Sequence, residues 1–178
     1  ADEQIDAFEK MYFYPYAFQY MAKIAAELDY ELVMISNQDG LGTDAFPEDT
    51  FWPVHNFIMN SFENEGVVFK DVYIDKTFPH ENAETRKPKT GLLTKYFSEE
   101  YDLGNSFVIG DRLTDIELAK NLGAKGVFIN DNSNLGTDEI SVKRSELESF
   151  IGLESNDWER IYEFLKLESR IAELTRNT

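Results

Sequence analysis

The 178 residues are enough for one domain, and a hydrophobic fraction of 42% is ample for a packed core. The formal net charge of −17 argues against nucleic-acid and anionic-membrane partners, because both require a basic surface. No apolar stretch approaches the roughly 20 residues that span a bilayer, and the lack of cysteine excludes disulfides and thiolate metal sites, so we expect a cytoplasmic protein.

Strands and helices are predicted to alternate along the chain. A capping-box pattern of Thr114 and Glu117 begins the fourth predicted helix, and Gly123 ends it. The alternation predicts an α/β fold with a doubly wound parallel sheet. In chain order we expect a helix at 15–29, a strand at 31–35, a helix at 50–63, a strand at 67–74, a polar loop at 75–89, a helix from Thr90, a strand at 106–109, the helix from Thr114, a strand at 127–129, a polar loop at 131–145 and a helix from Asn156 or Asp157.

Polar residues follow the ends of two predicted strands, where open α/β folds bind ligands. The run 36–43 carries a hydroxyl, an amide and two glycines, and the glycines let backbone N–H groups approach a ligand closely. After the strand at 106–109, Asp111 and Asp115 place two carboxylates at the same edge, which suits a hard cation such as Mg²⁺. Two other interpretations stay open: the first run as an ordinary turn, and Asp115 as a helix N-cap.

A third segment of interest is basic. Arg86, Lys87 and Lys89 bring three cations into four residues of a strongly acidic chain. Such a cluster can hold a phosphoryl group through a point charge and a guanidinium fork. A solvated basic turn is the alternative interpretation.

Taken in order, SNQDGLGT at 36–43, RKPK at 86–89 and GDRLTD at 110–115 resemble segments of the haloacid dehalogenase superfamily of phosphohydrolases. The match is best with the histidinol-phosphatase domain of bifunctional histidinol-phosphatase/imidazoleglycerol-phosphate dehydratases, and it runs from about Tyr12 to Asn130. Heptose-bisphosphate phosphatases share much of the pattern. The resemblance implies a Rossmann-like fold without a large cap domain and with a C-terminal helix. It also implies Mg²⁺-dependent hydrolysis of histidinol phosphate to histidinol, through an aspartyl-phosphate.

The resemblance also implies roles for individual residues. Ser36 would donate its hydroxyl to the transferring phosphoryl group, and Lys87 would neutralise the phosphate. Asp111 would ligate Mg²⁺, while Asp115 would hold either the metal site or Lys87 in place. Gln38 and Asp39 could meet a small cationic substrate. The implied set is therefore Ser36 and Lys87 as catalytic residues, Asn37, Gln38, Asp39 and Arg86 as phosphate or substrate ligands, and Asp111 and Asp115 at the metal.

The sequence departs from the family at the nucleophile. The family's Asp-x-Asp-Gly-Thr strand end has no match, since the chain opens on ADEQIDAFEKMYFYP and neither Asp2 nor Asp6 follows an apolar strand. In the family that strand lies between those that here end at Ser36 and Gly110, and its loss would leave backbone groups unpaired. We therefore expect the nucleophile strand upstream in a longer protein, and no turnover from the 178 residues alone.

Two further expectations concern zinc and the C-terminus. Some histidinol-phosphatases carry a Cys/His zinc loop before RKPK, but here only His80 remains, so no zinc is expected. The ending ESRIAELTRNT resembles a link to the dehydratase domain. We interpret 1–153 as the phosphatase domain and 154–178 as a helix and linker toward a fused dehydratase that is absent here. The alternatives are another small-molecule phosphatase of the superfamily, such as one for sugar bisphosphates, and a catalytically inactive binding module.

Overall fold

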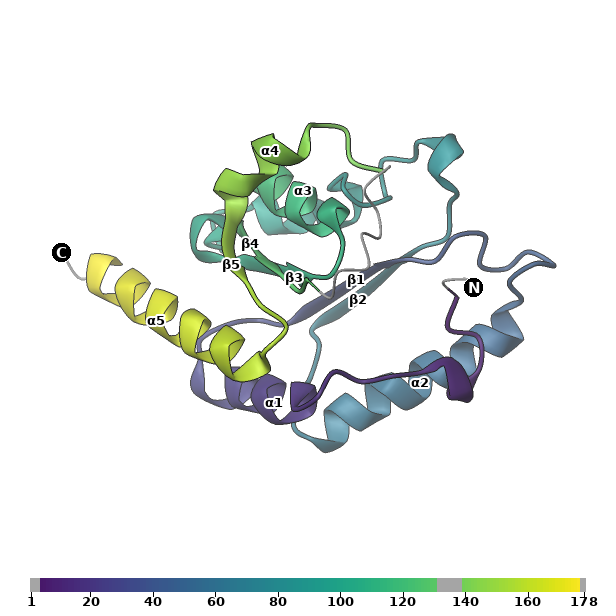
Figure 1. The fold of residues 1–178 in the computed structure, drawn as a ribbon, viewed down its shortest axis with the longest axis horizontal. Coiled ribbons are helices and arrows are strands. Elements are labelled where there is room, and N and C mark those ends of the chain that lie inside the picture. The colour runs from purple at the N-terminus through teal and green to yellow at the C-terminus, as the bar shows by residue number, and fades with distance from the viewer. Residues whose placement is uncertain (1–3, 131–138, 177–178) are drawn as a thin grey trace. The chain divides into compact units, whose positions relative to one another are not determined.

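The computed structural model describes residues 4–130 and 139–176 (Figure 1). Contacts between Cα atoms divide the chain into two compact units, Ala1–Arg86 and Lys87–Thr178. Each unit contains a parallel β-sheet with α-helices between its strands, so the predicted α/β class is confirmed. None of the helices in the described part is long and apolar enough to cross a membrane.

The first unit contains a two-stranded sheet. Strands β1 (Val33–Asn37) and β2 (Asp71–Asp75) are parallel, and the register places Asn37 beside Asp75. Both strands therefore end at the same edge of the sheet. The other elements of this unit are α1 (Ala17–Glu27), α2 (Glu48–Asn64) and the 3₁₀ turns η1 (Phe8–Lys10) and η2 (Pro79–Glu81).

A small aromatic core fixes the loop that follows β1. Leu41, Phe46 and Phe51 are buried together, and the half-buried Trp52 and Ile74 pack against them. The Phe46 and Phe51 rings meet edge to face with their centroids 5.7 Å apart, an arrangement favoured by the ring quadrupoles. Because Phe51 belongs to α2 and Ile74 to β2, this cluster anchors the glycine-containing run after β1 to both elements.

The second unit contains a three-stranded parallel sheet in the order β3-β4-β5. Helix α3 packs on β3 and β4 (Figure 1). A Cβ atom on Gly126 would lie 2.6 Å from Cδ1 of Ile116, so glycine permits this close packing. The elements are η3 (Gly91–Phe97), η4 (Leu103–Asn105), β3 (Phe107–Gly110), α3 (Leu113–Leu122), β4 (Lys125–Phe128), α4 (Arg144–Leu147), η5 (Glu148–Phe150), β5 (Ile151–Glu154) and α5 (Trp158–Arg176).

Several predicted elements need correction. The helix expected from Thr90 is a 3₁₀ segment, interrupted where Leu93 has φ −109° and ψ 15°. The expected capping box of Thr114 and Glu117 is wrong, because α3 begins at Leu113 and Asp115 accepts the N–H of Arg112 at 3.1 Å. Glu117 is instead buried and accepts hydrogen bonds from the backbone and hydroxyl of Ser141.

A strand and a short α-helix of the second unit were among the elements that were not predicted. Strand β5 has only four residues, too few for a clear pattern, and α4 begins inside the segment expected to be loop. Of that loop, 131–138 lies outside the described residues. The last helix is as expected, and Asp157 caps it by accepting the N–H of Glu159 at 2.9 Å.

Candidate active site

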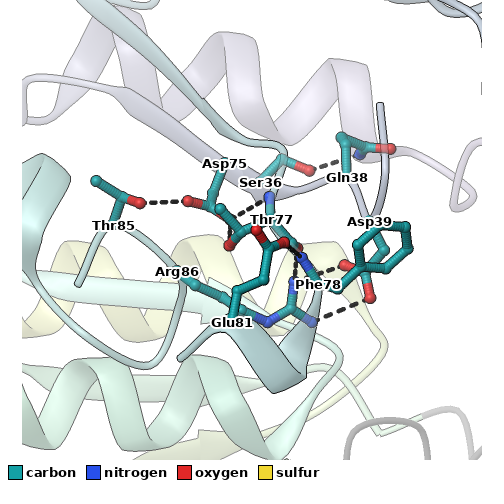
Figure 2. A network of polar contacts seen from close by, with 9 residues as sticks. All are labelled: Ser36, Gln38, Asp39, Asp75, Thr77, Phe78, Glu81, Thr85 and Arg86. Atoms are coloured by element: carbon teal, nitrogen blue, oxygen red, sulfur yellow. Dashed lines mark hydrogen bonds and ion pairs between the residues drawn. The ribbon is translucent and has the colours of Figure 1, made fainter. Parts of the chain in front are cut away.

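The residues at the end of β1 continue the ladder with β2 beyond the strands themselves. The N–H of Gln38 donates to the carbonyl of Asp75 at 2.7 Å, and the N–H of Gly40 donates to that of Lys76 at 3.0 Å. The amide of Gln38 donates to the hydroxyl oxygen of Ser36 at 2.7 Å (Figure 2). The predicted residues Ser36 and Gln38 are thus in contact, and the oxygen of Ser36 has a fixed orienting donor.

A buried carboxylate ends β2. Asp75 is only 3% exposed, and its Oδ1 accepts the N–H of Thr77 at 2.9 Å and the hydroxyl of Thr77 at 2.5 Å. Its Oδ2 accepts the hydroxyl of Thr85 at 2.5 Å. Burial acts to raise the pKa of Asp75, but these hydrogen bonds and the charge of Arg86 outweigh it, so the pKa lies below its ordinary value. Asp75 is therefore charged at neutral pH.

Arg86 forms a forked ion pair with Asp39. One guanidinium nitrogen lies 2.5 Å from Oδ1 and the other 3.2 Å from Oδ2, and the first also donates to the carbonyl of Thr77 at 2.8 Å (Figure 2). Arg86 is 6% exposed, whereas 39% of the Asp39 side chain remains exposed. Two-point hydrogen bonds of this kind fix geometry as well as charge. Two residues predicted to bind substrate are thus bound to each other.

The loop between β2 and Arg86 reaches over the turn after β1. Gly40 has φ +72°, and a Cβ atom there would lie 2.4 Å from the ring of Phe78, so both the backbone and the ring require glycine. The N–H of Phe78 donates to the carboxylate of Glu81 at 2.6 Å. His80 is exposed, and its ring stacks on that of Phe78 with centroids 5.6 Å apart.

In the second unit, Lys87 is paired with Asp115. Its Nζ atom lies 2.8 Å from Oδ1, and the two side chains are only 13% and 6% exposed. The carboxylate of Asp115 lies directly over Gly110, where an added Cβ atom would be 2.1 Å from Oδ2. Asp111 follows the last residue of β3 and is half-buried. The carboxyl end of β3 therefore holds an ion pair with a second carboxylate next to it in the chain.

These carboxylates fit part of a Mg²⁺ site. Oxygen ligands suit Mg²⁺, which commonly uses one or two carboxylates and completes its shell with water and phosphate. Within residues 4–130 and 139–176 there is no group of three or more His, Cys, Asp or Glu side chains that could hold a metal. Asp115 accepts from Lys87 and from the N–H of Arg112, so its carboxylate is fixed in position beside Asp111.

The sequence did not single out Asp75, Thr77 or Thr85, which form the most connected polar network of the first unit (Figure 2). One signal was available for Asp75, because it directly follows the apolar run of β2, as Asp111 follows that of β3. No comparable signal marks the threonines, whose role depends on the path of the loop.

Comparisons with known proteins agree with the fold. The family model described as HAD-hydrolase-like matches residues 84–146. A solved structure of D,D-heptose 1,7-bisphosphate phosphatase from B. bronchiseptica, complexed with magnesium and phosphate, superposes with a TM-score of 0.74 at 19% identity, covering 94% of this chain and 91% of that one. The fold and the matched family model agree with the resemblance of the chain to haloacid dehalogenase-like hydrolases.

The most informative relatives by sequence are bifunctional. The histidine biosynthesis bifunctional protein HisB of Spirosoma linguale is 51% identical over 180 residues, covering 99% of this chain and 47% of that protein. HisB of Bacteroides fragilis is 48% identical over 178 residues, covering 99% of this chain and 46% of that protein. The chain thus spans about half the length of these curated relatives.

Proposed function

We propose that the chain is a histidinol-phosphatase that hydrolyses histidinol phosphate to histidinol with Mg²⁺. The observation that carries the proposal is the buried Lys87–Asp115 ion pair at the end of β3, beside Asp111. A largely buried ammonium group paired with a carboxylate in a strongly acidic chain is well suited to meet an anionic phosphate. The similarity to HisB proteins over 99% of the chain supports the choice of substrate.

The residues of the second unit would neutralise the negative charge of the phosphate and bind the metal ion. Asp115 orients the ammonium group of Lys87, and Lys87 would offset the negative charge of the phosphoryl group during transfer. Asp111 would hold Mg²⁺, with Asp115 supporting the site through Lys87. When bound, Mg²⁺ supplies charge neutralisation and a template for the phosphate oxygens.

The residues of the first unit would bind and orient the substrate. Ser36, whose oxygen accepts from Gln38, keeps its own hydroxyl hydrogen to donate to a phosphoryl oxygen. Asn37 would lie beside it, and Asp39 with Arg86 would form the substrate-facing rim. We propose that hydrolysis proceeds through an aspartyl-phosphate, and none of the described residues is assigned as the nucleophile.

The proposal extends to the organisation of the protein. Residues 1–153 would form the phosphatase domain, and 154–178, which includes α5, would lead to a fused imidazoleglycerol-phosphate dehydratase. The bifunctional HisB relatives, of which the chain covers 47% and 46%, support this arrangement. A cytoplasmic location would fit a biosynthetic enzyme.

Phosphate release from histidinol phosphate by the full-length protein tests the proposal. We expect turnover with Mg²⁺, and its loss with a chelator and in the variant Lys87→Met. Turnover of heptose 1,7-bisphosphate in preference to histidinol phosphate would instead support a sugar-bisphosphate phosphatase, which the structural similarity favours as the second candidate. No hydrolysis of either compound with Mg²⁺ would overturn the proposal and leave an inactive binding module.

A further inference from the structure

The loop 76–86 is closed at both of its ends by one side chain. The carboxylate of Asp75 accepts from Thr77 at the beginning of the loop through Oδ1, and from Thr85 near its end through Oδ2 (Figure 2). Thr85 and Asp75 are ten residues apart in sequence. A single buried carboxylate thus holds the two ends of the loop together.

This closure determines where Arg86 lies. Arg86 follows Thr85 directly, and its guanidinium group donates to the carbonyl of Thr77 and to both oxygens of Asp39. The hydrogen bonds therefore connect the beginning of the loop, its end and the turn after β1. If Thr85 were released from Asp75, Arg86 would lose the backbone position from which it reaches Asp39.

Outside these hydrogen bonds, the loop is also held at its start, where Lys76 pairs with Glu48 and the carbonyl of Lys76 accepts the N–H of Gly40. Its central residues Pro79, His80, Glu81 and Asn82 are all exposed. The apolar contacts of the loop are the ring of Phe78 over Gly40 and the stack of His80 on that ring. A loop with few buried apolar contacts opens at low free-energy cost, so its buried hydrogen bonds to Asp75 contribute strongly to its order.

We propose that Asp75 is a positioning residue that fixes the loop 76–86 and, through Thr85, presents Arg86 and Asp39 to the substrate. The inference rests on the proposed function for its effect on catalysis, and on the network alone for its effect on the loop. Because Arg86 and Asp39 belong to the substrate-facing rim and not to the charge-bearing pair of the second unit, loosening the loop weakens substrate binding more than it slows the chemical step.

The kinetic test uses two substitutions of Thr85 in the full-length protein. Thr85→Val removes the hydroxyl and keeps the size of the side chain, and leaves a charged acceptor without its donor, so we expect KM for histidinol phosphate to rise about tenfold with kcat within about twofold. Thr85→Ser keeps the hydroxyl and should restore KM to within about twofold of the original. The control is Thr50→Val, which removes a hydroxyl that donates to Pro47 at the start of α2 and should leave both constants unchanged.

An unchanged KM in Thr85→Val would overturn the inference, as would a serine variant as impaired as the valine variant, because packing would then be responsible. Hydrogen–deuterium exchange without substrate tests the loop independently of activity. We expect the amides of 76–86 to exchange about tenfold faster in Thr85→Val, with those of α2 unchanged. If the unsubstituted protein hydrolyses no phosphomonoester, the proposed function fails but exchange still decides the loop closure, and equal exchange in both proteins would refute it.

Discussion

Arg86 and Lys87 are adjacent in sequence, carry the same charge and are both paired with an aspartate, yet their surroundings differ. Arg86 uses its planar fork to join both oxygens of Asp39, a half-exposed residue, and a backbone carbonyl. The ammonium group of Lys87 lies 2.8 Å from the carboxylate of Asp115, whose side chain is 6% exposed. The fork suits fixing a loop, whereas a compact ammonium group suits neutralising charge that changes during a reaction. We therefore propose a positioning role for the arginine and a catalytic role for the lysine.

Replacing the lysine should have the largest effect. Lys87→Met in the full-length protein removes the cation expected to face the phosphate and leaves the buried Asp115 without its partner. We expect kcat/KM for histidinol phosphate to fall by about 10²–10³-fold, chiefly through kcat, the range found for a lost electrostatic contact in an active site. Steady-state phosphate release measures this loss, and a decrease below about tenfold would mean that the two cations do not differ as described.

Changing the arginine should have a smaller and different effect. Arg86→Lys keeps the charge but cannot reproduce the two-point contact with Asp39 and the bond to Thr77. We expect KM to rise about tenfold while kcat changes little. The same assay reports both constants, and a loss confined to kcat would contradict the positioning role.

The close packing of Gly110 against Asp115, the ion-pair partner of Lys87, can be tested separately. Gly110→Ala would place a methyl group 2.1 Å from Oδ2 of Asp115, so the carboxylate or the strand must move. We expect a loss of about 1–3 kcal/mol in the free energy of unfolding, as for other overpacked sites. Urea denaturation measures it. The matched control is Gly104→Ala, where the nearest atom, Oδ1 of Asp102, would lie 3.6 Å away, and equal stability of the two variants would contradict the geometry.

The smallest expected effect is a pH dependence within the first unit. Burial of His55 beside Phe51 lowers its pKa below the ordinary value, so the folded state binds this proton less readily than the unfolded state. Stability should therefore be fully present above about pH 6.5 and should decline as the pH falls below it. Urea denaturation at several pH values should show a weaker decline for His55→Phe than for the exposed control His80→Gln, and identical profiles would rule out His55 as the source.

The sequence predicted the parts of the fold that depend on local pattern. The apolar runs of β1, β2, β3 and β4 and the spacing in α1 and α5 were recognisable, because burial on one element leaves a periodic trace. The 3₁₀ segment at Gly91–Phe97 was mistaken for an α-helix because both place apolar residues three or four apart. Strand β5 was missed because four residues carry too little pattern.

The candidate site was predictable to a similar degree. Ser36, Lys87 and Asp111 stood out because polar residues directly follow apolar strands or form an unusual basic cluster. Which side chains pair with one another was harder to predict from the sequence. The ion pair between Arg86 and Asp39, for example, joins residues that are 47 positions apart. Thr85 gave no signal, since a threonine in a polar loop is ordinary until the loop path brings it to Asp75.

The most direct test of the account is the ratio of kcat/KM for histidinol phosphate to that for heptose 1,7-bisphosphate, measured on the full-length protein with Mg²⁺. The account predicts a ratio of at least about 10², because a site that hydrogen-bonds and charge-matches one substrate rejects an analogue that leaves its polar groups unpaired. A ratio near or below one, or no hydrolysis of either compound, would contradict it.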